Sequence, residues 1–213
     1  MPVYSSFTHP STAFYLLWKI EEALEALYLQ LPPQFLADFD RDPLFSKDRM
    51  RQYLAVRVAL SCLLQKLALP ILPLSKNPQG RPVLGDGIFH ISFAHTRYLA
   101  AVALSTAFPI GIDVELVKPS LHRVQERFLK EKEKEAAHNC LEKLAIYWSA
   151  KEALYKRLDQ AAISSFKDIF IEPFPLHNQG ELVAHCNGKK YEMGYEQMGD
   201  RLLALHVLVY CKD

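Results

Sequence analysis

Apolar residues recur along this chain at two spacings, one typical of helices and one typical of strands. Steps of three and four positions predict amphipathic helices. These predicted helices cover residues 21–31, 45–69 and 141–158, and a further helix begins at Ser120. Ser46 is a suitable N-cap for the helix over 45–69, because its hydroxyl can accept a hydrogen bond from the first turn. Pro32 and Pro33 end the first helix.

Alternating or continuous apolar runs bounded by turn residues predict strands. These cover residues 12–20, two pieces between 89 and 105, and residues 110–116, 165–171, 181–186, 191–197 and 201–210. Asn187-Gly188 lies between two of the later strands and is a strong hairpin signal. The segment over residues 70–82 is rich in proline and is predicted to be loop. Mixed helices and strands without a visible repeat indicate an α+β protein.

Two carboxylates share one face of the strand predicted over residues 110–116. Alternation puts Ile112 and Val114 on one face and Asp113 and Glu115 on the other. Like charges on one strand face repel each other unless a cation or another partner offsets them. Magnesium would do so, since it binds a few carboxylates together with water and phosphate oxygens. The alternative is an exposed edge strand on which both carboxylates are simply solvated.

The helix predicted over residues 141–158 carries a carboxylate and two lysines close together. Glu152 and Lys156 stand one turn apart, and Lys151 precedes Glu152. Alone, a Glu-to-Lys pair at this spacing usually only stabilises a solvated helix face slightly. Combined with the strand, however, the helix completes a set of three carboxylates and two lysines. That set is suited to a metal-bound pyrophosphate.

Two motifs carry a family resemblance. They are Gly-Ile-Asp-Val-Glu at residues 111–115 and Trp-Ser-Ala-Lys-Glu-Ala-Leu-Tyr-Lys at residues 148–156. Together they resemble the signature of the 4′-phosphopantetheinyl transferases, specifically the longer single-chain type that activates surfactin synthetase and other peptide and polyketide synthetases. The resemblance implies two similar halves packed as a pseudo-dimer, with the ligand in the cleft between them. The boundary we expect separates residues 1–108, the nucleotide-binding side, from residues 109–213, which hold the metal-binding and catalytic motifs.

The resemblance also implies a reaction and roles for residues. Such enzymes move 4′-phosphopantetheine from coenzyme A to a serine of an apo acyl or peptidyl carrier protein, and release adenosine 3′,5′-bisphosphate. Asp113, Glu115 and Glu152 would hold Mg²⁺ on the pyrophosphate. Glu152 would take the serine proton, directly or through a metal-bound water. Lys156, together with Lys151, would stabilise or protonate the leaving phosphate.

Several residues of the first half fit the family's coenzyme A contacts. Arg51 and Arg57 lie where relatives place arginines against the 3′-phosphate and adenosine end of coenzyme A. Gly80-Arg81-Pro82 resembles a Gly-Lys-Pro element that borders the nucleotide. His95 matches the histidine of a Ser-His pair near the coenzyme, but Ala94 stands in place of the serine and removes one hydroxyl donor. Without the resemblance, a histidine at a strand end is more often structural.

The mixed charge run over residues 130–135 has two interpretations. Such runs are usually solvated surface. However, Arg127-Phe128-Leu129 followed by an acidic residue resembles a family segment with a glutamate close to the metal, and Glu133 fits that position best.

Composition limits the possible environments and partners. The formal net charge is +1, which gives no sign of a general nucleic-acid or membrane surface, and no apolar run approaches the roughly 20 residues of a membrane span. The scattered cysteines indicate reduced, mostly buried thiols in a cytoplasmic protein, which we expect to be a monomer. They are Cys62, Cys140, Cys186 and Cys211.

Two other functions stay open. A metal-dependent nuclease also combines acids with a lysine, but it would need a broad basic groove. A non-catalytic binder of coenzyme A and carrier protein, descended from such an enzyme, is suggested by Ala94.

Overall fold

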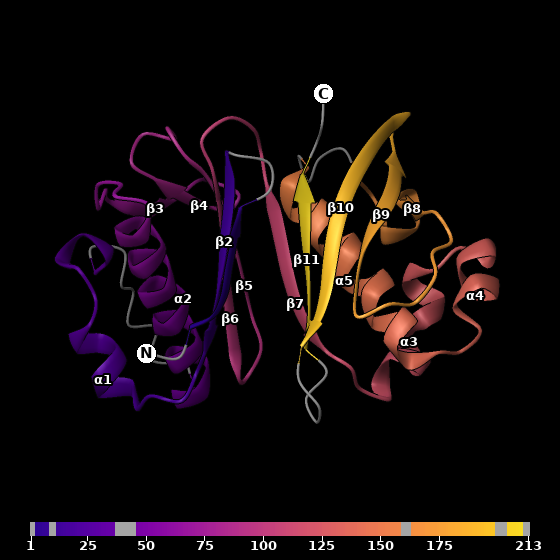
Figure 1. Ribbon diagram of the computed structural model, residues 1–213, viewed down its shortest axis with the longest axis horizontal. Helices are drawn as coiled ribbons and strands as arrows, with labels where there is room; N and C mark the ends of the chain where they lie inside the picture. Colours follow the sequence, from indigo (N-terminus) through magenta and orange to yellow (C-terminus); the bar gives the residue numbers. More distant parts are fainter. Residues whose placement is uncertain (1–2, 9–11, 37–45, 159–162, 199–203, 211–213) are drawn as a thin grey trace. The chain divides into compact units, whose positions relative to one another are not determined.

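The computed structural model of the 213-residue chain describes residues 3–8, 12–36, 46–158, 163–198 and 204–210. The chain divides into two compact units, residues 1–108 and 109–213. Each unit combines an antiparallel sheet with helices, so the α+β class is confirmed (Figure 1).

The first unit is built on a sheet with the strand order β1-β2-β6-β5. Its strands are β1 (Val3–Thr8), β2 (Ala13–Lys19), β5 (His90–His95) and β6 (Leu99–Ser105), and each neighbouring pair is antiparallel. The strands predicted over 12–20 and between 89 and 105 are therefore present. The first of the two pieces predicted between 89 and 105 is β5, which includes the segment from Ser92 to His95.

Helix α2 (Lys47–Lys66) packs against β2, β5 and β6. Its predicted start is confirmed, because the Ser46 hydroxyl accepts a hydrogen bond from Arg49 N at 3.2 Å. The core formed by this packing includes Leu60 of α2, Trp18 of β2 and Val102 of β6. The remaining helices of this unit are short: α1 (Leu24–Leu29) and the 3₁₀ helix η1 (Pro33–Phe35).

The loop predicted over residues 70–82 is in part a hairpin, so that prediction is wrong in detail. Strands β3 (Leu74–Lys76) and β4 (Pro82–Leu84) pair antiparallel. The prolines obscured this pairing, yet they occupy places that a strand tolerates, with Pro82 as the first residue of β4. Burial of Leu74 and Leu84 attaches the hairpin to the core of the first unit.

The second unit is built on a sheet with the strand order β7-β11-β10-β9-β8. The strands are β7 (Gly111–Leu116), β8 (Phe170–Ile171), β9 (Gln179–Cys186), β10 (Lys189–Met198) and β11 (Ala204–Tyr210). Asn187 and Gly188 have φ of 51° and 73°, as the hairpin signal requires. The strand predicted over 165–171 is mostly the 3₁₀ helix η3 (Phe166–Asp168), because the Ser165 hydroxyl accepts from Lys167 N and caps it.

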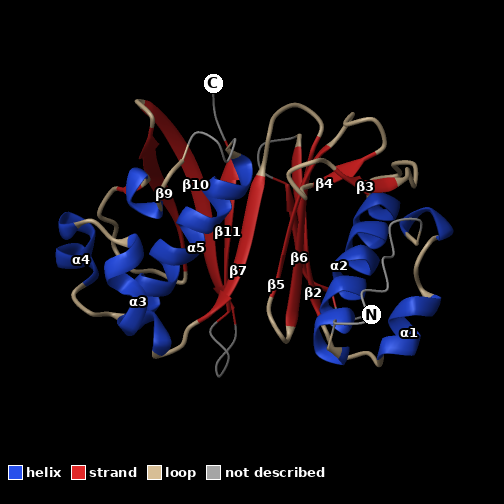
Figure 2. Ribbon diagram, turned by 180° about the vertical axis from the view of Figure 1, so that it is seen from behind, coloured by secondary structure: helices blue, strands red, loops and turns tan. Residues whose placement is uncertain are grey.

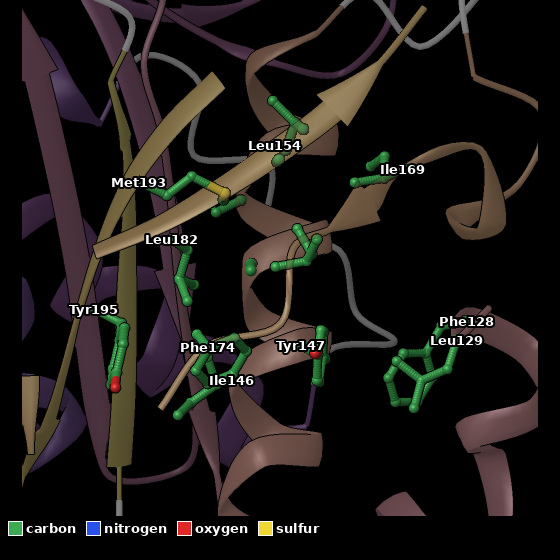
Figure 3. Close-up of a cluster of buried hydrophobic side chains, with 14 of the residues drawn as sticks. Phe128, Leu129, Ile146, Tyr147, Leu154, Ile169, Phe174, Leu182, Met193 and Tyr195 are labelled. Carbon is green, nitrogen blue, oxygen red and sulfur yellow. The ribbon is translucent and has the colours of Figure 1, made fainter. Parts of the chain in front are cut away.

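The α-helices described in the second unit are α3 (Ser120–Phe128), α4 (Glu131–Ala137) and α5 (Leu141–Arg157). Helix α5 runs along β7 and β11 (Figure 2). Figure 3 shows part of the apolar cluster of this unit, which includes Tyr147 and Leu154 of α5, Leu182 of β9 and Met193 of β10. Within the described ranges, no helix has the length and apolar character that a membrane span requires.

The cysteines that the structure describes are free thiols. Cys186 is buried, whereas Cys62 and Cys140 are partly buried. Cys211 lies outside the described residues.

Candidate active site

Asp113 is the centre of a polar cluster between β7 and α5. One carboxylate oxygen, Oδ2, accepts a hydrogen bond from Ser149 Oγ at 2.7 Å. The other, Oδ1, accepts from Lys156 Nζ at 2.7 Å. Lys156 Nζ also donates to Ile112 O at 3.1 Å, which fixes the lysine against the strand backbone. Only 8% of Asp113 is exposed, so the alternative of a solvated edge-strand carboxylate is wrong for this residue.

The two groups that bind Asp113 come from one face of α5. Ser149 and Lys156 are seven positions apart, which is about two helical turns and brings them to the same side of the helix. The sequence predicts a functional role for Lys156 but not for Ser149. The helical spacing from Lys156 is the available signal, but a serine carries no charge that would mark it as functional.

The close packing of α5 on β7 depends on Gly111. A Cβ at this position would overlap the carbonyl oxygen of Ala153 and lie 3.1 Å from Arg157 N. Glycine therefore allows the helix backbone to approach the strand directly. Because Asp113 follows two residues later on the same strand face, its carboxylate comes within reach of the helix side chains.

Glu152 and Glu115 surround the same centre with negative charge. Burial raises the pKa of the Glu152 carboxyl above its ordinary value; the charge of Asp113 raises it as well, Lys156 opposes the shift, and Glu115 adds to it. The Glu115 carboxylate accepts from Lys118 Nζ at 3.0 Å and from Leu116 N at 2.9 Å. The predicted set of carboxylates thus interacts electrostatically as a group.

No group of three or more His, Cys, Asp or Glu side chains in the described part of the chain is arranged to hold a metal ion. The Lys156 ammonium instead neutralises Asp113 directly. The chemistry of the donor set nevertheless fits a hard divalent cation, since carboxylate oxygens are its preferred ligands. Such an ion would also offset the burial and the neighbouring negative charges that raise the pKa of Glu152.

Lys151 is not brought together with Asp113. Its ammonium is fully buried and donates to Glu133 Oε2 at 2.8 Å and to three backbone carbonyls. Burial lowers the pKa of Lys151, and the charge of Glu133 opposes that shift. Glu133 is itself fully buried, so the solvated-surface interpretation of the charge run is wrong at this residue.

The arginines predicted to contact coenzyme A lie on α2. Arg57 is 5% exposed, and its guanidinium carbon stands 3.3 Å from the centroid of the Tyr53 ring. Arg57 Nη1 also donates to Tyr53 O at 3.3 Å. Lys76 Nζ of β3 lies 5.9 Å from the same ring centroid. Arg51 is partly buried one turn and a half earlier on the helix.

The other predicted coenzyme residues follow in the hairpin and in β5. Gly80 has a φ of 78° in the β3–β4 turn, where its N donates to Asn77 O at 2.8 Å. Arg81 N donates to the Asn77 side chain at 2.9 Å, and Pro82 opens β4. His95 is exposed at the end of β5, and Ala94 pairs with Ala101 of β6.

Residues 109–204 match the family model of the 4′-phosphopantetheinyl transferase superfamily. The matched range contains Asp113, Glu115 and the whole of α5, so every side chain of the candidate active site lies within it. The first unit lies before it. No curated protein matches the chain.

Proposed function

We propose that this protein transfers the 4′-phosphopantetheine group of coenzyme A to a serine of an apo acyl or peptidyl carrier protein and releases adenosine 3′,5′-bisphosphate. The observation that carries the proposal is the Asp113 cluster, held by Ser149 and Lys156 and flanked by Glu152. Its position inside the region that matches the superfamily supports the same conclusion.

Asp113, Glu115 and Glu152 are the residues that would hold Mg²⁺. When bound, the ion would neutralise the charge that develops on the pyrophosphate oxygens. Burial raises the pKa of the Glu152 carboxyl, and the charges of Asp113 and Glu115 raise it further; a bound cation would offset this unfavourable charge. The resemblance and the superfamily match point in the same direction.

Glu152 is the residue we assign to take the proton of the carrier serine. The serine oxygen forms a bond to the phosphorus attached to the pantetheine arm, and the bond from that phosphorus to the bridging oxygen breaks. A carboxylate with a raised pKa is a stronger base than an ordinary glutamate and is therefore better matched to this proton transfer near neutral pH.

Lys156 is assigned to the leaving phosphate of adenosine 3′,5′-bisphosphate. Two of its N–H groups donate to Ile112 O and to Asp113 in the described structure, and its side chain keeps 27% exposure. A lysine ammonium carries three N–H donors. The third can donate to the departing oxygen and stabilise its charge.

The first unit is proposed to bind the nucleotide end of coenzyme A. Arg51, Arg57 and Arg81 supply guanidinium groups suited to phosphate or to stacking on a base, and His95 supplies a further donor. In this proposal the two units, residues 1–108 and 109–213, form a pseudo-dimer of the surfactin-synthetase-activating type with the coenzyme between them. The protein would act as a cytoplasmic monomer.

The test is the intact mass of small apo carrier proteins of several types after incubation with this protein, coenzyme A and Mg²⁺. The expected result is the addition of one phosphopantetheine, absent when EDTA replaces Mg²⁺. Coenzyme A binding without any mass gain would favour a silent binder. If the protein does not bind coenzyme A but binds DNA in a salt-sensitive manner, a nuclease would be favoured.

A further inference from the structure

A second polar cluster, fully buried, lies on α5 away from Asp113. Lys151 Nζ shares its three N–H groups among four acceptors: Phe128 O at 2.7 Å, Ile169 O at 2.7 Å, Phe166 O at 3.2 Å and Glu133 Oε2 at 2.8 Å. The backbone acceptors belong to the end of α3 and to the segment from η3 to β8, and Phe128 and Ile169 are labelled in Figure 3. One ammonium thus joins α5 to two other parts of the second unit.

Glu133 extends the same cluster to α4 and β8. Its Oε2 accepts from Lys130 N at 2.7 Å, and its Oε1 accepts from Ile171 N at 2.8 Å. Both carboxylate oxygens and the Lys151 ammonium therefore have protein partners. We call Lys151, Glu133 and these backbone partners the buried clamp.

The buried clamp and the Asp113 cluster hold α5 from different sides. Lys151 follows Ser149 by two positions, which rotates its side chain by about 200° around the helix axis. Ser149 and Lys156 face β7, so Lys151 points away from that strand, toward α4 and β8. On the strand side, Gly111 lets the α5 backbone sit directly on β7.

We propose that the buried clamp is a positioning device, which sets the rotation and depth of α5 against β7 so that Ser149 and Lys156 reach the Asp113 carboxylate. Lys151 and Glu133 act through the helix and are not assigned contact with coenzyme A or the carrier. The consequence for turnover rests on the proposed function. The consequence for the geometry of Lys156 does not.

The chemistry of the clamp favours positioning over stability. A buried ion pair contributes little net stability, because desolvating both charges offsets most of their attraction. Its hydrogen bonds are directional, however, and breaking one leaves a buried partner unsatisfied. A small error in the position of a catalytic group slows the reaction strongly, since a displacement of about 1 Å can reduce a rate about 100-fold.

The test uses two variants that keep both charges but change reach or shape. Glu133→Asp shortens the carboxylate by one methylene, and Lys151→Arg replaces a compact ammonium with a planar fork. Leu182→Ala is the control, because it removes a buried side chain of the same core that takes part in none of the clamp's hydrogen bonds. Each variant is first checked by circular dichroism and thermal melting, and rates are expressed per folded molecule well below the melting temperature.

Both clamp variants should lower kcat at least about tenfold while the Kd of coenzyme A changes less than about threefold. Leu182→Ala should keep kcat within about twofold of wild type, even if its melting temperature falls as much as those of the two clamp variants. Turnover in the clamp variants equal to that of Leu182→Ala would overturn the proposal, since the clamp would then be structural only.

The second measurement needs no substrate. In a ¹H–¹⁵N spectrum of lysine ammonium groups, the Lys156 signal is assigned by its loss in Lys156→Met. Glu133→Asp and Lys151→Arg should shift this signal or broaden it through faster exchange with water, whereas Leu182→Ala should leave it unchanged. An unshifted, equally protected Lys156 signal in the clamp variants would overturn the proposal, whether or not the wild-type protein transfers phosphopantetheine.

A comparison on the unmodified protein decides the matter if neither variant folds. In low urea, the Ile171 amide reports opening of the clamp through its bond to Glu133. The proposal requires Lys156 to lose its ammonium protection at the same urea concentration as Ile171. Continued protection of Lys156 after Ile171 has opened would contradict it.

Discussion

Helix α2 with strand β6 and helix α5 with strand β7 are the same kind of layer in the two units, yet they bury different chemistry. The residues of β6 that face α2 are apolar: Ala100, Val102 and Leu104. On β7 the corresponding helix-facing residue is Asp113, whose carboxylate oxygens are bound from α5 by a serine and a lysine. One layer is a hydrophobic core, and the other is a core interrupted by a polar cluster.

The two layers differ in how strictly their residues are determined. An apolar layer is stabilised by burial without directional constraint, so many sequences satisfy it. A buried carboxylate is tolerated only when each oxygen has a partner, so its neighbours must be specified individually. The second unit carries two such specified clusters on α5 and is also the unit matched by the superfamily model.

Replacing the central residue of each layer should show the difference between the two layers most clearly. Asp113→Ala should reduce transfer about a thousandfold and abolish its dependence on magnesium, because the carboxylate at the centre of the cluster is lost. Val102→Ala should lower thermal stability but leave the rate per folded molecule near that of wild type. The measurement is the initial rate of carrier modification across a magnesium titration. Unchanged magnesium dependence in Asp113→Ala would refute the ligand assignment.

Lys156→Ala should have the next largest effect, a fall in kcat of about 100-fold. Coenzyme A affinity should change less than about threefold, since the lysine is assigned to the charge that develops as the bond breaks. Isothermal titration gives the affinity, and steady-state kinetics give the turnover number. A normal rate in this variant would show that the role given to Lys156 is wrong.

Glu152→Gln should alter how stability depends on pH. The pKa of Glu152 is raised in the folded protein, so folding opposes its ionisation, and its contribution to stability falls as pH rises through the raised pKa. Without divalent metal, the glutamine variant should therefore have a higher melting temperature than wild type at pH 7. This difference should shrink as the pH falls toward the ordinary pKa of a glutamate carboxyl.

The matched control for this experiment is Glu135→Gln, because Glu135 is exposed on α4. Its melting temperature should follow wild type at both pH values. If Glu152→Gln had a lower melting temperature than wild type at neutral pH, this would contradict the raised pKa of Glu152.

Tyr147→Phe should have the smallest effect. Burial raises the pKa of the Tyr147 hydroxyl, with Glu133 adding to the shift, and its oxygen has no hydrogen-bond partner among the described residues. Removing it should therefore leave the free energy of unfolding unchanged or slightly higher.

Tyr195→Phe provides the contrast, because the Tyr195 hydroxyl accepts from His177 N at 3.1 Å and donates to Pro175 O at 3.3 Å. Its loss should cost about 1 kcal/mol. Chemical denaturation of both variants checks the pair. An equal loss of unfolding free energy in Tyr147→Phe would show that the Tyr147 hydroxyl has a hydrogen-bond partner.

Sequence patterns predicted the elements whose signal is local. The strand of Asp113 follows from alternation, and α2 and α5 follow from helical spacing and from the Ser46 cap. The β3–β4 hairpin was missed because two strands of three residues contain too few alternations to outweigh their flanking prolines.

Long-range partners were beyond local reasoning. Glu133 lies in a run of alternating charges, and only its contacts with Lys151 and Ile171, 18 and 38 positions away, remove it from solvent. The role predicted for Lys151 at the phosphate came from the family resemblance of its motif, whereas a two-residue step from Ser149 turns it to another face of α5. Glycine at position 111 allows the contact that completes the site, and no pattern in the sequence reveals the helix against it.

The most direct test of the proposed transfer is a single-turnover stoichiometry. Wild-type protein, coenzyme A, Mg²⁺ and one apo carrier protein are mixed, and carrier mass and released adenosine 3′,5′-bisphosphate are measured together. One nucleotide should be released for each phosphopantetheine gained, and neither product should form when the carrier serine is replaced by alanine. An unmodified carrier with no nucleotide released, across carriers from fatty-acid, polyketide and peptide synthesis, would contradict the proposed transfer.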